Sequence, residues 1–284
     1  MELILFSLTF LLLLIGSITD LRRREVPDFV SYVGVALGIG LNLIWSVYLW
    51  DFGFVLHSLF GLLFFFALGC LLYYTGQWGG GDAKVLMAVG SLIGLELSLK
   101  STFISFLINL LIITAVYSIV WLSFLAWRNW KKVRNEFESQ VSSFKNFKSL
   151  NILLFTVFLI ALFVSFTSWP MKYVTLLLSF SALCLFHFSF FINAIEKSCM
   201  QKLVKVEDLT EGDWIVKDVL IDSKRITGPK DLGISKDNIQ ELLKFRKQNK
   251  IEKVLVRFGV PLVPGFFVAW LITITYGSLL AIFI

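Results

Sequence analysis

Charged residues are scarce in this sequence. Lys, Arg, Asp and Glu make up only 16% of its 284 residues, whereas 57% are hydrophobic and 29 are Phe. Soluble domains carry about 25% charged residues, so a soluble globular fold is excluded and most of the chain is expected to lie in lipid. Cysteine is also rare. Cys70, Cys184 and Cys199 are too widely spaced for a disulfide framework or a tetra-Cys zinc site, and we expect neither a metal nor a cofactor.

In place of charge, the sequence has long apolar runs. A helix needs about 20 apolar residues to cross the hydrocarbon of a bilayer. The first run is a retained span rather than a secretory signal, because no basic region precedes it and Asp20 and three arginines follow it. We predict an all-α polytopic membrane protein with about eight transmembrane helices, at residues 3–19, 29–49, 53–75, 84–98, 102–127, 150–169, 171–194 and 261–283.

The distribution of basic residues predicts the orientation. With Arg22, Arg23 and Arg24 inside, the basic segments at 128–148 and 197–257 also lie inside, and only Lys100 and Lys172 remain outside. Both termini are then external, and the net charge of +6 reflects membrane insertion rather than nucleic-acid binding. The predicted division is catalytic helices in 1–127, a basic cytoplasmic loop in 128–149, two helices in 150–195, a cytoplasmic module in 196–258 and the last helix in 259–284.

The two charged segments have different predicted structures. Segment 128–148 alternates aromatic and basic residues, which is typical both of an amphipathic helix on the membrane surface and of a plain linker. The module at 196–258 is a small α+β insert before the last helix, with strands at 214–216 and 254–256 and a helix that begins near Ser235.

Two acidic residues are predicted to meet at one membrane face. Asp20 ends the first span and Asp82 begins the fourth, so counting spans places both carboxylates on the cytoplasmic side. Acidic residues at such positions are costly unless they are solvated, paired or functional. A close carboxylate pair shares one proton, so one group can take a proton from a water while the other protonates the leaving group. These residues predict an aspartyl peptidase without a metal.

The residues beside Asp82 support a functional site. Gly79, Gly80 and Gly81 remove side-chain bulk, so that an extended substrate can approach closely, although a triple glycine also simply breaks a helix. The roles open to Lys84 are stabilising the carboxylates, orienting the loop, contacting lipid phosphate or anchoring the helix.

The pattern resembles a known family. Asp20 followed by Arg22–Arg24 and Val26-Pro27-Asp28, and then Gly79-Gly80-Gly81-Asp82-Ala83-Lys84, is similar to the prepilin peptidases with a Gly-x-Gly-Asp motif, especially the archaeal ones that process preflagellins and pilin-like precursors. The resemblance implies that Asp20 and Asp82 are the catalytic pair. It also implies removal of a short basic leader at the cytoplasmic boundary of the membrane.

Departures from related enzymes refine this expectation. Bacterial members have paired Cys-x-x-Cys motifs and methylate the new N-terminus, but the loop 21–28 is short and lacks cysteine, so we expect no methyltransferase activity. Presenilin-like proteases have Tyr before the first aspartate and a Pro-Ala-Leu motif, where this chain has Thr19 and Pro261-Leu262-Val263. That branch, a proton-coupled transporter and a non-enzymatic membrane scaffold are the alternatives.

Several other residues are candidates for supporting roles. Asp28 is a rival for the active site, and its alternative role is that of an acid at a helix N-terminus. Pro261 and Pro264 either shape the start of the last span or leave backbone groups exposed for the substrate. The acidic residues of the 207–213 run, Glu207, Asp208, Glu211 and Asp213, could attract a basic leader or could form a solvated face.

Overall fold

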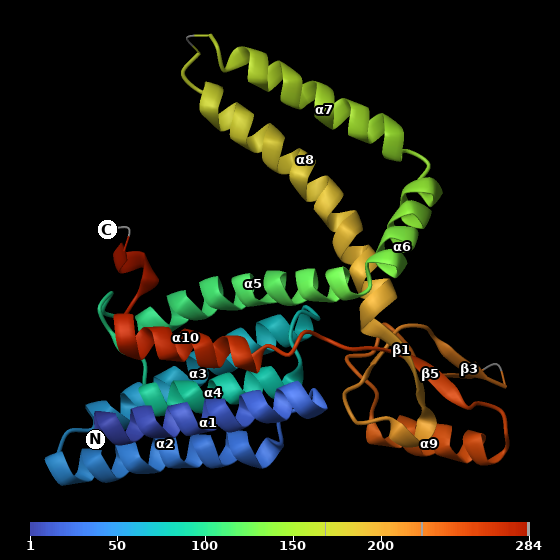
Figure 1. Cartoon of the computed structure of the whole chain (residues 1–284). Coiled ribbons are helices and arrows are strands. Elements are labelled where there is room, and N and C mark those ends of the chain that lie inside the picture. The colour runs from blue at the N-terminus through green and yellow to red at the C-terminus, as the bar shows by residue number, and fades with distance from the viewer. Residues whose placement is uncertain (168, 223, 283–284) are drawn as a thin grey trace. The chain divides into compact units, whose positions relative to one another are not determined.

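Most of the chain is helical in the computed structural model, which describes residues 1–167, 169–222 and 224–282 (Figure 1). Each predicted span falls on a helix. Among the described residues, six helices are long and apolar enough to cross a membrane. They are α1 (Glu2–Arg23), α2 (Asp28–Leu49), α3 (Gly53–Tyr74), α5 (Thr102–Arg128), α7 (Phe147–Val164) and α8 (Lys172–Ile195), the last continued by the π-helical turn η1 (Glu196–Met200). The protein is a polytopic, largely α-helical membrane protein, as predicted.

Two of the predicted spans correspond to shorter helices. These are α4 (Gly80–Ile93) and α10 (Val263–Tyr276), each of 14 residues. Such a helix is about 21 Å long, less than the roughly 30 Å of hydrocarbon. Gly94 and Gly277 end them with φ angles of 67° and 76°, and hydropathy alone does not reveal such turns. A 3₁₀ turn, η3 (Leu279–Ile282), follows α10. Position 168 of the predicted span 150–169 lies outside the described residues, and so does position 283 of the predicted span 261–283.

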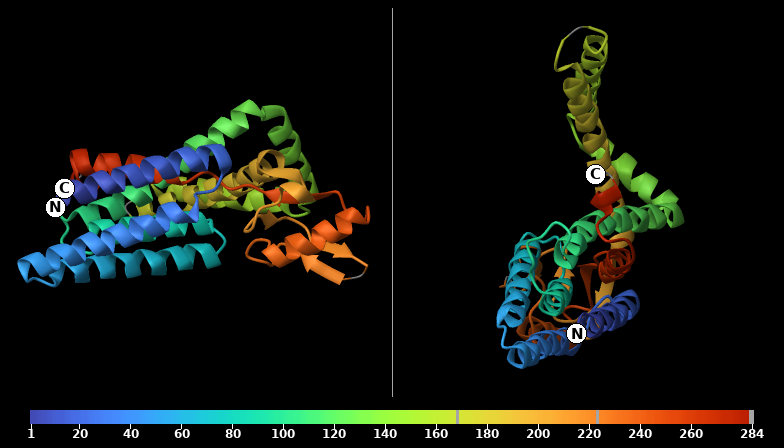
Figure 2. Two further views of the ribbon diagram at one scale, coloured as in Figure 1. Left: turned by 90° about the horizontal axis from the view of Figure 1, so that it is seen from below. Right: turned by 90° about the vertical axis from the view of Figure 1, so that its left-hand side faces the viewer.

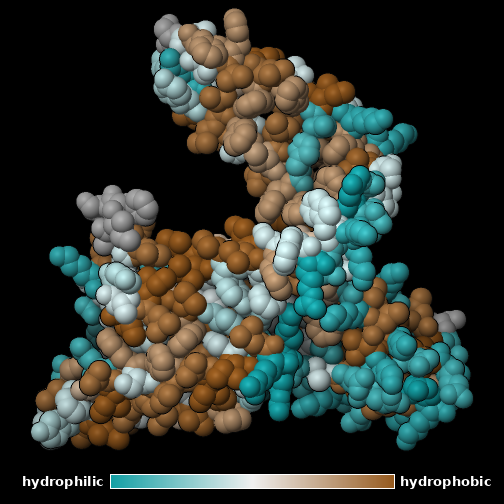
Figure 3. Space-filling model, viewed as in Figure 1, coloured by the Kyte–Doolittle hydropathy of each residue, from teal (hydrophilic) through white to brown (hydrophobic). Residues whose placement is uncertain are grey.

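The chain divides into two units, residues 1–121 with 203–284, and residues 122–202. In the first unit, α4 packs against α1, α2 and α3, and α1 packs against α10 (Figure 2). The core between these helices contains the fully buried side chains of Leu13, Phe65, Leu86 and Trp270. Figure 3 shows hydrophobic residues over most of the visible surface of these helices, as expected for a surface that faces lipid.

Small residues allow α3 and α4 to approach each other closely. A Cβ added at Gly90 would lie 2.3 Å from the carbonyl oxygen of Gly61, and a Cβ added at Gly61 would lie 2.2 Å from that of Gly90. A Cβ added at Gly69 would lie 2.8 Å from the Cβ of Ala83, the residue that follows Asp82. Small residues commonly mediate helix packing in membranes because backbones can then touch. This packing fixes α4, which carries Asp82, at the centre of the bundle.

The second unit consists of the end of α5, α6 (Trp130–Ser143), α7, α8 and η1. The basic segment predicted as an amphipathic helix or a linker is helical in α6. A small core of Ala126, Val133, Ala194 and Ile195 joins α5, α6 and α8. Helices α7 and α8 pair along their length. Most of their side chains are exposed, as expected for helices that face lipid.

The C-terminal part of the first unit contains an α/β module (residues 203–258). Its three-stranded sheet has the order β1 (Gln201–Lys205), β5 (Lys253–Arg257), β2 (Trp214–Ile215), and β2 pairs antiparallel with β5. The strands β3 (Val219–Ile221) and β4 (Lys224–Thr227) form a hairpin, and the short turn η2 (Val206–Asp208) follows β1. The strands predicted at 214–216 and 254–256 are confirmed as β2 and β5.

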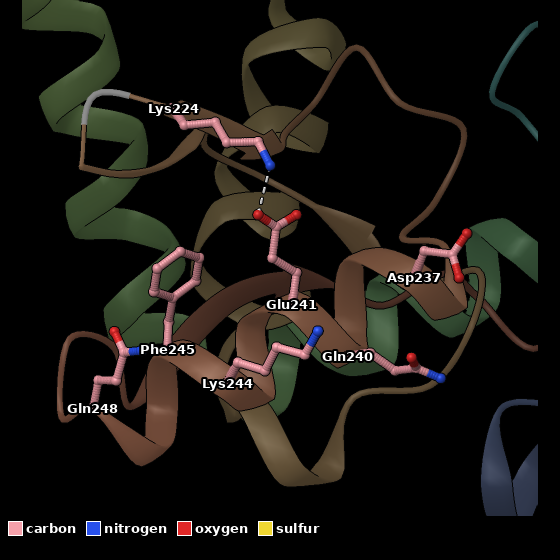
Figure 4. Close-up of a pocket in the computed structure, with 7 residues that line it drawn as sticks. All are labelled: Lys224, Asp237, Gln240, Glu241, Lys244, Phe245 and Gln248. Atoms are coloured by element: carbon pink, nitrogen blue, oxygen red, sulfur yellow. Dashed lines mark hydrogen bonds and ion pairs between the residues drawn. The ribbon is translucent and has the colours of Figure 1, made fainter.

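The helix predicted from Ser235 is α9 (Lys236–Lys247), and the Ser235 hydroxyl accepts the Asn238 N–H at 3.2 Å. Leu242 of α9 and Val256 of β5 lie in the core of the module. On its outer surface, Lys224 forms an ion pair with Glu241 at 2.6 Å (Figure 4). Hydrophilic residues cover much of the visible face of the module (Figure 3), in contrast to the bundle.

Candidate functional site

Asp20 and Asp82 lie at the same end of the helical bundle. Asp20 is in the last turn of α1, and Asp82 is in the first turn of α4. Figure 1 shows the end of α1 and the starts of α2, α4 and α10 together at the end of the bundle that carries the α/β module. The carboxyls of Asp82 and Asp20 are close enough for their charges to repel each other.

Asp82 is held by the glycine run that precedes it. Gly79 is the N-cap of α4, and its N–H donates to Asp82 Oδ2 at 3.1 Å. Asp82 thereby satisfies one of the N–H groups that have no partner within a helix at its start. Gly80 and Gly81 form the first turn of α4, and a Cβ added at Gly81 would approach the Val26 nitrogen to 3.7 Å. The glycine run therefore orients the carboxyl and lies against the chain segment that follows α1.

Asp20 is held by the first turn of the last helix. Its side chain is 6% exposed, and its Oδ2 accepts the N–H of Val263 at 3.1 Å. Val263 is the first residue of α10, and Pro264 is the second. Pro is suited to this position because it needs no hydrogen bond there. Pro261 is buried in the segment just before the helix. The two prolines thus flank the backbone N–H that orients Asp20.

Arg24 connects the end of α1 with the segment before α10. It ends α1 in a left-handed conformation with φ 61°, and its N–H donates to the backbone oxygen of Asp20 at 2.9 Å. Its Nη1 donates to the Gly259 carbonyl at 2.6 Å, and its guanidinium lies 5.5 Å from the centre of the Trp121 ring. Arg24 therefore positions both the helix that carries Asp20 and the segment leading to Val263.

Lys84 and Asp28 form a pair of their own. Lys84 Nζ lies 2.6 Å from Asp28 Oδ1, and their side chains are 35% and 56% exposed. The Lys84 ammonium also lies 5.8 Å from the ring of Tyr32. Asp28 is in the first turn of α2, whose N-cap is Pro27. The ion pair links α2 to α4 two residues beyond Asp82, so it accounts for both side chains as a contact between helices.

The acids at 207–213 are largely engaged within the module. Glu207 pairs with Arg246 at 3.4 Å, and Glu211 pairs with Lys236 at 3.1 Å. Asp213 Oδ2 accepts the N–H of Thr210 at 2.9 Å, and burial raises the pKa of Asp213. These contacts reduce the charge available for a basic leader.

Three contacts link the α/β module to the end of the bundle near the two aspartates. The Tyr73 hydroxyl donates to the Leu232 carbonyl at 2.9 Å, and the Thr210 hydroxyl donates to Glu25 Oε1 at 2.6 Å. A Cβ added at Gly76 would lie 3.3 Å from the Trp214 ring. Gly76 belongs to the loop that leads into the glycine run, so the module braces the segment immediately before Asp82.

The structure adds residues that the sequence alone did not indicate. The Val263 N–H reaches Asp20 across 243 positions, a contact that no local pattern indicates. Tyr117 of α5 is within electrostatic reach of Asp20 and Arg24. The sequence feature that could have indicated Tyr117 is that it and Thr114 are polar residues one turn apart in an apolar span.

Comparison with known proteins gives consistent relatives. Residues 7–126 match the type IV leader peptidase family. A preflagellin peptidase of Methanocaldococcus jannaschii is 40% identical over 81 residues, which are 28% of this chain and 34% of the relative. A preflagellin peptidase of Methanococcus maripaludis is 32% identical over 81 residues, 28% of this chain and 35% of the relative.

A prepilin peptidase, EppA, of Methanothermobacter thermautotrophicus is 30% identical over 116 residues, 41% of this chain and 30% of the relative. The chain thus spans about a third of the length of the curated relatives that it matches. The matched region contains both Asp20 and Asp82. The predicted resemblance to prepilin and preflagellin peptidases is confirmed, and residues 7–126 are similar to the type IV leader peptidase family.

Proposed function

We propose that this protein is an aspartic endopeptidase that removes the short basic leader from pilin-like or archaeal flagellin precursors at the cytoplasmic face of the membrane. The observation that supports this proposal most strongly is the pair of carboxylates at one end of the bundle. Each accepts a backbone N–H on one oxygen, Asp20 from Val263 and Asp82 from Gly79. The other oxygen of each carboxyl can then bind a water or the substrate.

In this proposal the pair holds one proton between its two carboxyls. The ionised carboxylate takes a proton from a water, and the water oxygen attacks the scissile carbonyl carbon. The protonated partner donates a hydrogen bond to the carbonyl oxygen and then passes its proton to the leaving amine. One peptide bond and one water become a carboxyl and an amine. No other nucleophile takes part.

The placement of the pair at helix ends suits a substrate that lies partly in lipid. The apolar helix of the precursor would lie along the bundle, and its basic leader would extend into the cytoplasm. The positive-inside distribution of Lys and Arg supports this orientation, with the α/β module on the same side. Partners are then the precursor proteins and membrane lipid, and not nucleic acid.

The alternatives fit the site less well. A proton-coupled transporter would carry its paired acids near the midplane of the membrane, whereas Asp20 and Asp82 are in terminal turns of their helices. A presenilin-like protease has Tyr before its first aspartate and a Pro-Ala-Leu motif, where this chain has Thr19 and Pro261-Leu262-Val263. A scaffold gives no reason for two carboxylates, both oriented by backbone N–H groups, within reach of each other.

The test is cleavage of candidate precursors co-expressed with the protein, followed as a shift in precursor size. Wild-type protein should cleave, whereas Asp20→Asn and Asp82→Asn should not. Asp51→Asn is the matched control, because Asp51 precedes α3 at the other end of the bundle and its carboxylate accepts the Gly53 N–H at 2.8 Å, a bond that Asn can also make. Full cleavage by either active-site variant would exclude the carboxylate pair.

Mass spectrometry of the product tests the remaining part of the proposal. The new N-terminus should be unmethylated, and its position in the precursor should fall between the basic leader and the apolar helix. A methylated terminus would show that the short loop at 21–28 is a poor guide to methyltransferase activity.

A further inference from the structure

Two hydroxyls on one face of α5 lack hydrogen-bond partners. In the part of the chain that the structure describes, Thr114 Oγ1 and the Tyr117 hydroxyl are fully buried and neither donates to nor accepts from another group. Unsatisfied polar groups are especially unfavourable within a membrane protein, because no water replaces the missing bond. Such groups call for an explanation, and a bound ligand is one.

The state of Thr114 differs from that of other threonines in this protein. A helical threonine normally satisfies its hydroxyl by donating to the carbonyl four residues earlier. Thr9, Thr156 and Thr273 do so, at 2.8 Å each. Thr114 has equivalent carbonyls in α5 but does not use them, and its side chain is only 8% exposed. Its hydroxyl therefore keeps its hydrogen-bonding capacity, which a substrate that displaces the groups covering it could use.

The two hydroxyls lie beside the start of α10, which orients Asp20. A Cβ added at Gly265 would lie 3.4 Å from Tyr117 Cδ1 and 3.6 Å from Thr114 Cα. Gly265 is two residues after Val263, whose N–H binds Asp20. Tyr117 is also within electrostatic reach of Asp20. The absence of a side chain at Gly265 keeps this face of α5 close to the first turn of α10.

Another buried group, on α10, differs in its surroundings. Trp270 Nε1 is also buried without a hydrogen bond among the described residues. Its ring, however, packs edge-on against Phe6 and Phe106, with centroids 5.4 and 5.9 Å apart. Apolar packing accounts for Trp270, whereas Thr114 and Tyr117 are next to the residues that hold Asp20.

We propose that Thr114 and Tyr117 bind the extended backbone of the precursor on the side of the scissile bond that lies against α5. This inference rests on the proposed peptidase function. A peptide bond can be attacked only when the chain around it is extended, and its N–H and C=O groups then need partners. Hydroxyls can donate to a carbonyl or accept from an N–H. The Cβ atoms of residues one helical turn apart are about 5–6 Å apart, so Thr114 and Tyr117 lie on the same face of α5.

The test compares Tyr117→Phe and Thr114→Val with wild type in detergent, using a purified precursor that the wild type cleaves. Tyr117→Phe removes the hydroxyl, and Thr114→Val replaces it with a methyl group of similar size. Loss of one hydrogen bond to the substrate should lower kcat/KM about fivefold, mainly through a higher KM. The thermal midpoint should stay the same or rise, because neither hydroxyl has a partner among the described residues.

Tyr48→Phe and Thr156→Val are the matched controls and should cleave like wild type. Tyr48 is 73% exposed on α2, and Thr156 lies in α7 with its hydroxyl bonded to Ile152. Binding of the precursor to the Asp82→Asn protein, measured by crosslinking, should weaken by the same factor when Tyr117→Phe is added. This arm reports on binding without catalysis.

The outcomes separate this inference from the proposed function. If wild type cleaves and both hydroxyl variants have kcat/KM within twofold of wild type, the inference is wrong and the peptidase stands. A lower thermal midpoint in both variants would also refute it, because the hydroxyls would then have partners inside the protein. If wild type cleaves no precursor, or Asp82→Asn still cleaves, both proposals fall together.

Discussion

The close contact between α3 and α4 makes a specific prediction about Gly90. A Cβ in Gly90→Ala would lie 2.3 Å from the Gly61 carbonyl oxygen and 2.7 Å from Phe65 Cδ2. Carbon and oxygen atoms in contact are normally about 3.3 Å apart, so the two backbones must separate by about 1 Å. Overpacking of a core costs about 1–3 kcal/mol, and a backbone obstacle favours the upper value. Because α4 carries Asp82, the same shift should reduce cleavage.

Gly40→Ala isolates this clash from the effect of alanine itself. Both positions are within helices, so both substitutions gain up to about 1 kcal/mol of helix propensity. Nothing lies within 4 Å of a Cβ added at Gly40. The difference between the two variants therefore reports the clash and should be about 3 kcal/mol, measured by unfolding in mixed micelles with increasing SDS. Equal stability of the two variants would refute the close packing of α3 on α4.

Two further predictions concern the residues around the carboxylates. Arg24→Ala should lower cleavage about fivefold because it releases the Gly259 carbonyl. Arg23→Ala removes the same charge from an exposed position on the same turn and should not lower cleavage. Equal effects of the two substitutions in a cleavage assay would assign the loss to charge alone. Lys84→Met and Asp28→Asn should each keep most of the cleavage activity and change the free energy of unfolding by less than about 1 kcal/mol, because the ion pair between these residues is partly exposed. A tenfold loss of kcat in Lys84→Met alone would instead place Lys84 at the reacting groups.

Local patterns predicted the helices well. Apolar runs located every span, and counting spans was enough to place Asp20 and Asp82 at one end of the bundle. In the α/β module, Ser235 and the apolar residues of 214–216 and 254–256 predicted α9, β2 and β5. The strands β1, β3 and β4 were not predicted.

Contacts across the bundle could not be predicted in this way. The sequence offered Asp28 as a rival for the active site or as an acid at a helix N-terminus. It did not indicate the ion pair that its carboxylate forms with Lys84, 56 positions away. The N–H of Val263 reaches Asp20 because α10 starts beside the end of α1, and neither apolar periodicity nor charge encodes that start. Span counting and the family resemblance both predicted Asp20 and Asp82 as the catalytic pair, but the groups that orient the two carboxyls belong to segments that have little pattern of their own.

This arrangement connects the α/β module to the proposed catalytic pair in the bundle. The two carboxylates depend on two loop segments, the glycine run before α4 and the segment before α10, since each supplies the N–H that orients one carboxyl. Trp214 packs on the first loop at Gly76, and the second leads directly from β5 into α10. A disturbance of the module would therefore reach both carboxyls through their backbone partners while the helix packing of the bundle stays intact.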